Sequence, residues 1–202
     1  MPDPLPPPRP AVVKLGGSLV GTPALTPLLA ALAGRGAPLV LVAGGGPLAD
    51  GVRALQPRLG LSDAACHRMA ILAMEQTAHA FADLAPGLAL AATPAEIAQA
   101  HAQGRAALWR PAAMALAARD LPESWELTSD SLAAWLAHAL NATRLTLVKS
   151  APAPIGSGPA DWVAAGLVDP LFPAFAARLA GPVEVALPAA LAAASARKDI
   201  AA

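Results

Sequence analysis

Short apolar runs alternate along the chain with longer alanine-rich segments. The runs that indicate buried strands cover residues 11–15, 38–43, 88–92, 106–109, 145–148 and 183–186. The segments between them have the composition of helices over residues 23–33, 47–55, 62–84, 94–102, 129–140, 169–179 and the region after Pro188. Strand, turn and helix in this repeated order predict an α/β fold with a parallel sheet.

The beginning of the chain has a different composition. Residues 1–10 are rich in proline and contain no apolar signal core, which predicts a polyproline-like tail rather than a secretory leader. Residues 11–202 are expected to form a single domain, because a chain of 202 residues with 55% hydrophobic composition can bury one large core.

Charge and cysteine content narrow the classes of function. The net charge is zero, from 14 basic and 14 acidic residues, so nothing marks a surface for nucleic acid or an anionic membrane. No apolar run reaches the roughly 18 residues that span a bilayer. The single cysteine, Cys66, cannot form an internal disulfide and fits a reducing compartment. A soluble, cytoplasmic protein that acts on a small molecule is therefore expected.

Two of the three lysines follow core strands. Lys14 and Lys149 both lie at the predicted carboxyl end of a strand, the edge at which open α/β sheets bind ligands. A lysine there supplies a compact positive charge for a phosphoryl oxygen. Alternatively, each lysine ends its strand and reaches solvent. Gly16 and Gly17 strengthen the phosphate hypothesis for Lys14, because glycines let backbone N–H groups approach an anion closely.

A second glycine cluster, Gly44–Gly46, separates the second strand from a helix. Its spacing with Ala49 formally matches a dinucleotide-binding fingerprint. The acidic residue expected at the end of the next strand is missing, however, because the chain from Ser62 onward has a helical pattern. No Walker-type phosphate loop occurs. The third cluster, Thr128–Ser131, opens a helix and could be an ordinary N-cap.

These clusters together carry a family resemblance. The strings K-L-G-G-S from Lys14, A-G-G-G from Ala43 and T-S-D-S-L-A-A-W-L-A from Thr128 resemble the amino acid kinase superfamily. The resemblance implies a three-layer αβα sandwich with a mostly parallel central sheet. It also implies an acceptor-binding part over about residues 11–125 and a nucleotide-binding part over about 126–202, which here is reduced in length.

The resemblance assigns roles residue by residue. Lys14, Asp130 and Lys149 are the expected catalytic residues, with Asp130 orienting the lysines. The expected nucleotide-binding residues are Gly16, Gly17, Ser18, Thr128 and Ser129, with ATP and Mg²⁺ as cofactors. Gly44, Gly45 and Gly46 are expected to bind the acceptor. This chemistry needs alignment of the reactants and neutralisation of negative charge, and no covalent nucleophile.

A narrower likeness is to the short aminomethylfuran phosphate kinases, through the stretches that begin at Gly60, Leu121 and Leu147. Those enzymes phosphorylate a phosphate-bearing acceptor in the synthesis of methanofuran-type one-carbon carriers. The small size of the chain favours this branch over the longer uridylate kinases. The usual Thr-Asp pair after the penultimate strand is replaced here by Lys149 and Ser150. A noncatalytic nucleotide- or oxyanion-binding protein, or another kinase of the superfamily, therefore stays open as an alternative.

Some side chains have both a structural and a functional interpretation. His67 lies on the same helix face as Ile71 and Met74, as either a core histidine or a residue of the acceptor pocket. Arg53 and Arg58 could pair with an acceptor phosphate or lie on the surface. The tryptophans, Trp125 included, are interpreted as core residues. The long helix is apolar on most sides, which favours a homo-oligomer. The spacing of histidines and Cys66 predicts no metal site in the protein itself.

Overall fold

The computed structural model describes residues 9–35 and 38–198 of the chain. Residues 1–8 of the predicted tail thus lie outside the described residues. The last two residues of that segment are held against the domain. Arg9 Nε donates to the backbone oxygen of Asn141 at 2.7 Å, and the Thr143 N–H donates to Pro10 O at 2.8 Å.

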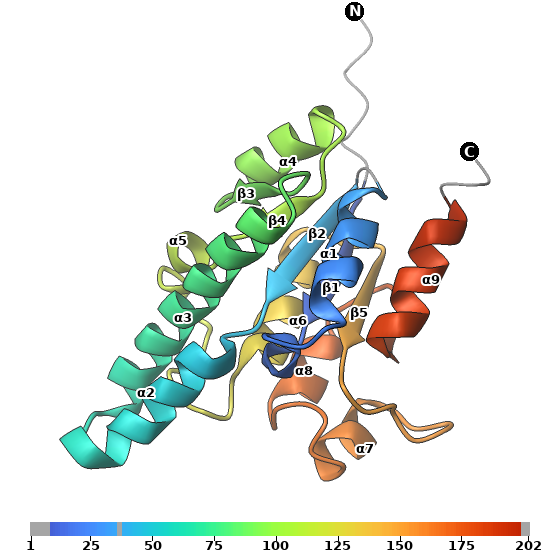
Figure 1. Ribbon diagram of the computed structural model, residues 1–202. Coiled ribbons are helices and arrows are strands. Elements are labelled where there is room, and N and C mark those ends of the chain that lie inside the picture. The colour runs from blue at the N-terminus through green and yellow to red at the C-terminus, as the bar shows by residue number, and fades with distance from the viewer. Residues whose placement is uncertain (1–8, 36–37, 199–202) are drawn as a thin grey trace, which may run out of the picture.

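A six-stranded sheet forms the centre of the molecule, and all of its strand pairs are parallel (Figure 1). The strands are β1 (Ala11–Leu15), β2 (Leu39–Ala43), β3 (Ala89–Ala91), β4 (Ala107–Trp109), β5 (Arg144–Val148) and β6 (Val183–Ala186). Their order across the sheet is β3-β4-β2-β1-β5-β6. The predicted strands are all present; β2, β3 and β4 are shortened by a residue at one or both ends, and β5 begins one residue earlier.

Helices cover both faces of the sheet. They are α1 (Leu25–Ala33), α2 (Gly46–Leu59), α3 (Asp63–Leu84), α4 (Pro94–Ala102), α5 (Ala112–Ala115), α6 (Ser129–Ala139), α7 (Pro159–Ala164), α8 (Phe172–Ala176) and α9 (Pro188–Lys198), with a 3₁₀ turn, η1, at Gly17–Leu19. The α/β sandwich predicted from the sequence is therefore confirmed. Figure 1 shows α2 and α3 side by side, reaching beyond the carboxyl ends of the strands.

Four helices differ from the prediction. Helix α2 runs past Pro57 and ends at Gly60, whose left-handed φ of 66° terminates it. The helix predicted over 169–179 is shorter, because Asp169 is held in the preceding loop by contacts to α6. Two short helices were not predicted: α5, and α7, which follows the loop at 150–158.

Alternation along the central strands decides which side chains reach the site. In β1, Val13 and Leu15 join the apolar cluster that packs on α1, while Val12 faces the opposite cluster, which contains residues of α6 and α8. Lys14 shares the direction of Val12 because side chains two residues apart lie on one face. It therefore points toward α6 from the middle of the sheet.

The order of the strands creates a switch point. From β1 the chain adds β2, and later β4 and β3, on one side, and then returns to place β5 on the other side of β1. Crossover connections diverge there, which leaves a crevice at the carboxyl ends of the two strands. Lys14 and Gly16 lie at the end of β1, and Lys149 follows β5 directly.

Candidate functional site

A buried cluster of three charges lies at the switch point. Lys14 Nζ is 2.8 Å from Asp130 Oδ1, and Lys149 Nζ donates to Asp130 Oδ2 at 2.7 Å. The side chains of Lys14 and Asp130 are 4% and 7% exposed, and that of Lys149 is 13% exposed. The structure thus brings together the three residues that the sequence singled out as catalytic. With two cations to one carboxylate, the cluster carries a net positive charge.

The surroundings of the cluster move the pKa values of two of its members. Burial by itself raises the pKa of Asp130, but the positive charges of Lys14 and Lys149 outweigh it and hold that pKa below its usual value. Burial and repulsion from Lys14 lower the pKa of Lys149 to about 8, against the attraction of Asp130. Lys149 is therefore a cation that titrates close to neutral pH.

The two glycine clusters touch each other. A Cβ added to Gly17 would lie 2.5 Å from the backbone nitrogen of Gly46, and one added to Gly44 would lie 2.6 Å from that of Gly17. Gly46 also has a left-handed φ of 53°. Any side chain at Gly17 or Gly44 would force these loops apart. The glycines therefore have a packing role in addition to any role in binding.

Close packing leaves some backbone donors free and uses others. The Gly16 N–H donates to Val148 O, and the Gly44 N–H donates to Leu15 O. Gly16 and Gly44 thus have no free donor for a ligand, which counts against the role expected of Gly16. Within residues 9–35 and 38–198, none accepts a hydrogen bond from the N–H groups of Gly17, Ser18, Gly45 or Gly46. The free donors lie at the start of η1 and at the start of α2, where an anion is favoured.

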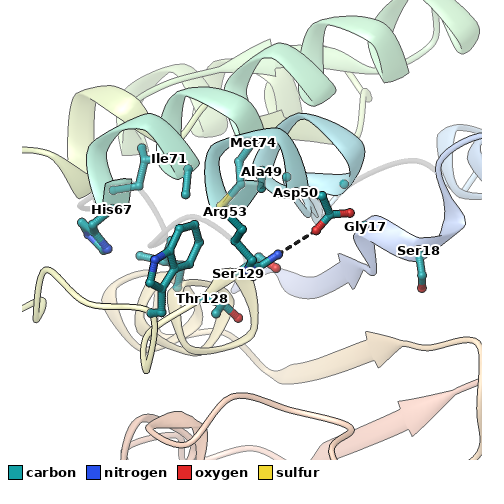
Figure 2. Close-up of a pocket in the computed structure, with 15 residues that line it drawn as sticks. Gly17, Ser18, Ala49, Asp50, Arg53, His67, Ile71, Met74, Thr128 and Ser129 are labelled. Carbon is teal, nitrogen blue, oxygen red and sulfur yellow. Dashed lines mark hydrogen bonds and ion pairs between the residues drawn. The ribbon is translucent and has the colours of Figure 1, made fainter. Parts of the chain in front are cut away.

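A cavity of about 290 Å³ opens beside these donors. It is lined by Gly17, Ser18, Gly45, Gly46, Ala49, Asp50, Arg53, His67, Ala70, Ile71, Met74, Trp125, Thr128, Ser129 and Leu132. In Figure 2, Ser18 and His67 lie at opposite ends of the cavity, with Arg53 between them. Ser129 connects the cavity to the buried charges, because it directly precedes Asp130.

Arg53 presents its charge to this cavity. Its guanidinium lies 2.8 Å from Asp50 Oδ1 and 4.6 Å from the centre of the Trp125 ring, so an acid and an aromatic face hold it in place. Trp125 Nε1 in turn donates to Gln56 Oε1 at 2.6 Å. Arg58 is exposed and does not line the cavity. Of the two arginines considered, only Arg53 is placed to meet a ligand there.

His67 is buried at the wall of the cavity. It is 5% exposed, and burial lowers its pKa below the ordinary value, against the opposing influence of Glu123 and a backbone contact with Ser124. The imidazole is therefore neutral at pH 7 and can either donate or accept a hydrogen bond. The histidine thus belongs both to the core face of α3 and to the cavity.

Two residues of the site escaped the sequence analysis. Trp125, interpreted there as core, is only half-buried and lines the cavity; its position in a Pro- and Glu-containing loop was the available signal. Asp169 is buried, and its carboxylate accepts hydrogen bonds from Thr128 and Ser131 in the first turn of α6. Nothing near Asp169 in the sequence indicates that contact.

Neither a metal-binding cluster nor a membrane-spanning helix occurs among the described residues. No group of three or more His, Cys, Asp or Glu side chains among residues 9–35 and 38–198 is arranged to hold a metal ion. No helix in that same part of the chain is long and apolar enough to cross a membrane.

Solved structures with the same fold include two nucleotide kinases. The uridylate kinase from Archaeoglobus fulgidus matches with a TM-score of 0.66 at 17% identity, over 93% of this chain and 95% of that chain. The UMP kinase from Bacillus anthracis matches with a TM-score of 0.65 at 13% identity, over 91% and 89%. At these identities the likeness is one of fold, and it extends over nearly the whole of both chains in each comparison.

Sequence comparison gives a family. A [5-(aminomethyl)furan-3-yl]methyl phosphate kinase from Methanocaldococcus jannaschii is 29% identical over 134 residues, which cover 64% of this chain and 61% of that protein. The match thus spans less than two thirds of that relative. The profile of the amino acid kinase family matches residues 9–153. Since this match covers well over half of the 202 residues, the chain belongs to the amino acid kinase family.

Proposed function

We propose that the protein is an ATP-dependent kinase that phosphorylates a small, phosphate-bearing acceptor to a diphosphate. The observation that carries the proposal is the buried cluster of Lys14, Asp130 and Lys149 at the switch point of the sheet. Two lysines oriented by one carboxylate supply positive charge where phosphoryl transfer accumulates negative charge. The free N–H groups of Gly17 and Gly46 lie at the edge of the cavity.

In this proposal an acceptor phosphate oxygen attacks the γ-phosphorus of ATP. The new P–O bond forms as the bond to the β,γ-bridging oxygen breaks, and ADP leaves. Lys14 and Lys149 stabilise the charge on the transferring group, and Asp130 fixes both ammonium groups in place. Mg²⁺ bound by the nucleotide would supply further positive charge to its phosphates. Ser18, Thr128 and Ser129 are the side chains placed to meet the phosphates.

We further propose [5-(aminomethyl)furan-3-yl]methyl phosphate as the acceptor, which would place the protein in methanofuran-type carrier synthesis. Support comes from the relative that acts on this compound and from the cavity itself. At about 290 Å³ the cavity suits a single small ring. Arg53 offers a charge for the acceptor phosphate, and Trp125 and Met74 offer apolar walls for the ring. His67 is the polar group at the far end.

The test is an ADP-release assay with MgATP and three acceptors: the aminomethylfuran phosphate, UMP and isopentenyl phosphate. Turnover with the first acceptor, at a kcat/KM well above the other two, is the expected result. Turnover only with UMP or isopentenyl phosphate would support the kinase activity and contradict the proposed acceptor. ATP binding without ADP release on any acceptor would instead indicate the noncatalytic binding protein.

Two further parts of the proposal concern the state of the protein in the cell. A cytoplasmic location fits the single, buried Cys66. A homo-oligomer fits the exposed leucines of α3, since Leu72 and Leu84 are 46% and 47% exposed. Light scattering on the purified protein would measure the oligomeric state directly, and a monomer would remove this part of the proposal.

A further inference from the structure

The first turn of α6 is capped by a residue from another part of the chain. Asp169, in the loop before α8, accepts hydrogen bonds from the Thr128 N–H at 3.0 Å, from Thr128 Oγ1 at 2.8 Å and from the Ser131 N–H at 3.0 Å. The Ser131 hydroxyl donates to its other oxygen. Asp169 is 7% exposed and Ser131 is fully buried. One buried carboxylate therefore satisfies four donors around a single helical turn.

This arrangement replaces the usual cap. A threonine at the N-cap normally accepts a hydrogen bond from the third residue of its own helix. Thr128 makes no such bond and donates to Asp169 instead. The N–H of Ser131, which the N-cap side chain would ordinarily satisfy, is bound by Asp169. The first turn of α6 is thus held from outside the helix.

Because Asp169 caps α6, the carboxylate of Asp130 is available for other contacts. An aspartate in the first turn of a helix can itself accept hydrogen bonds from the free N–H groups there. Asp130 lies between Thr128 and Ser131, yet one of its oxygens is 2.8 Å from Lys14 and the other 2.7 Å from Lys149. Asp169 thus accepts the hydrogen bonds of the helix terminus, and Asp130 faces the two lysines.

We propose that Asp169 is a positioning residue for phosphoryl transfer, which fixes the first turn of α6 so that Asp130 stays between Lys14 and Lys149. The inference rests on the proposed function for its catalytic meaning. Its second link is the backbone: the Leu171 N–H donates to Glu126 O at 3.3 Å, which joins the Asp169 loop to the segment that leads into Thr128. Loosening the loop therefore moves both the turn and the charge that it carries.

The kinetic test uses Asp169→Asn, which keeps the shape of the side chain. The amide retains one acceptor oxygen and places N–H groups against the donors of the turn. We expect kcat to fall by about 10- to 100-fold, because small misplacement of a catalytic group has effects of this order. The fall in kcat should exceed any rise in the KM for ATP, because Asp169 itself contacts no substrate, although Thr128 and Ser129 move with the turn. The matched control is Thr93→Ala, which removes the N-cap of α4 (a 3.2 Å bond from the Glu96 N–H) far from the cluster, and should leave kcat unchanged.

A second measurement does not depend on turnover. The chain contains three lysines, so ¹³C-labelled lysine gives three side-chain signals, which Lys14→Arg and Lys198→Arg assign. The charged groups that face Lys149 are Lys14 from β1 and Asp130 from α6. If Asp130 loses its position, its attraction weakens, and Lys149 should titrate below its wild-type value of about 8.

The outcomes separate the two proposals. A lower titration midpoint of Lys149 in Asp169→Asn, unchanged in Thr93→Ala, supports positioning even if the wild-type protein turns over none of the acceptors. An unchanged midpoint and an unchanged kcat would overturn the inference while leaving the kinase intact. Should Asp169→Asn not fold, Ser131→Ala removes one of the four donors, and the same two readouts should move in the same direction by a smaller amount; if neither moves, the inference fails.

Discussion

The substitution Asp130→Asn tests the buried charge cluster most directly, because it removes one charge at nearly constant shape. Lys14 and Lys149 would remain buried without their carboxylate. Removing one partner of a buried ion pair typically destabilises a protein by about 3–5 kcal/mol. We expect a loss of this size at pH 6, where Lys149 is charged in the wild-type protein.

The pH dependence gives the prediction a sign. The pKa of Lys149 is lowered from 10.5 to about 8, which corresponds to about 3 kcal/mol against the charged form in the folded state. Since the unfolded chain binds more protons between these values, wild-type stability rises with pH across that window through Lys149. Without Asp130 the pKa of Lys149 falls further. In the variant, Lys149 therefore loses its proton, and with it the repulsion from Lys14, at a lower pH than in the wild type. The stability deficit of the variant should therefore be smaller at pH 9 than at pH 6.

Urea unfolding followed by tryptophan fluorescence measures both quantities. Asp50→Asn is the matched control, because Asp50 also pairs with a cation at 2.8 Å but its side chain is 70% exposed. Its loss should stay below about 1 kcal/mol, as for other exposed pairs. Equal stability of Asp130→Asn and the wild type at pH 6, or a deficit that does not shrink by pH 9, would refute the charge assignment of the cluster.

Other substitutions address the lysine, the glycine loops and the acceptor side. Lys14→Ala should lower kcat by about 10²-fold or more through lost charge stabilisation, with the circular dichroism spectrum unchanged; wild-type ADP release would contradict the proposed function. Gly17→Ala should cost about 1–3 kcal/mol in urea unfolding, because its Cβ meets backbone at 2.5 Å, whereas Gly51→Ala in α2, with open space around it, should stabilise by up to about 1 kcal/mol. Arg53→Ala should raise the acceptor KM about tenfold or more and leave the ATP KM unchanged, while Arg58→Ala should change neither; equal effects of the two would remove Arg53 from the acceptor site.

Local pattern was enough to predict most of the sheet and the positions of the two lysines of the charge cluster. Lys14 and Lys149 end strands, and strand alternation with parallel pairing places them at one edge. Local pattern placed Asp130 at the start of a helix, and the family resemblance implied its contact with the lysines. Each of these residues lies in, or directly beside, a strand or helix that local pattern predicts, so the sequence near it indicates where it lies.

The remaining features depend on contacts between distant segments. Asp169 caps a helix that begins about forty positions earlier, and no local rule connects them. Gly16 was expected to offer its N–H to a phosphate, but β5 lies beside it and Val148 O accepts that hydrogen bond. From the sequence, Trp125 resembles a core residue; only the fold shows that its side chain lines the cavity beside α2. In each case the role of the residue depends on a contact with a segment that is close in space but distant along the chain.

The position of β5 beside β1 has a consequence for how the protein folds. During synthesis, β1 emerges first, and β2, β3 and β4 can pair while β5 is still being made. The edge of β1 that faces away from β2 stays unpaired until β5 has been made, so its pairing with β5 closes a long loop and is intrinsically slow. Activity should therefore appear only in a late step of refolding, after most of the secondary structure has formed.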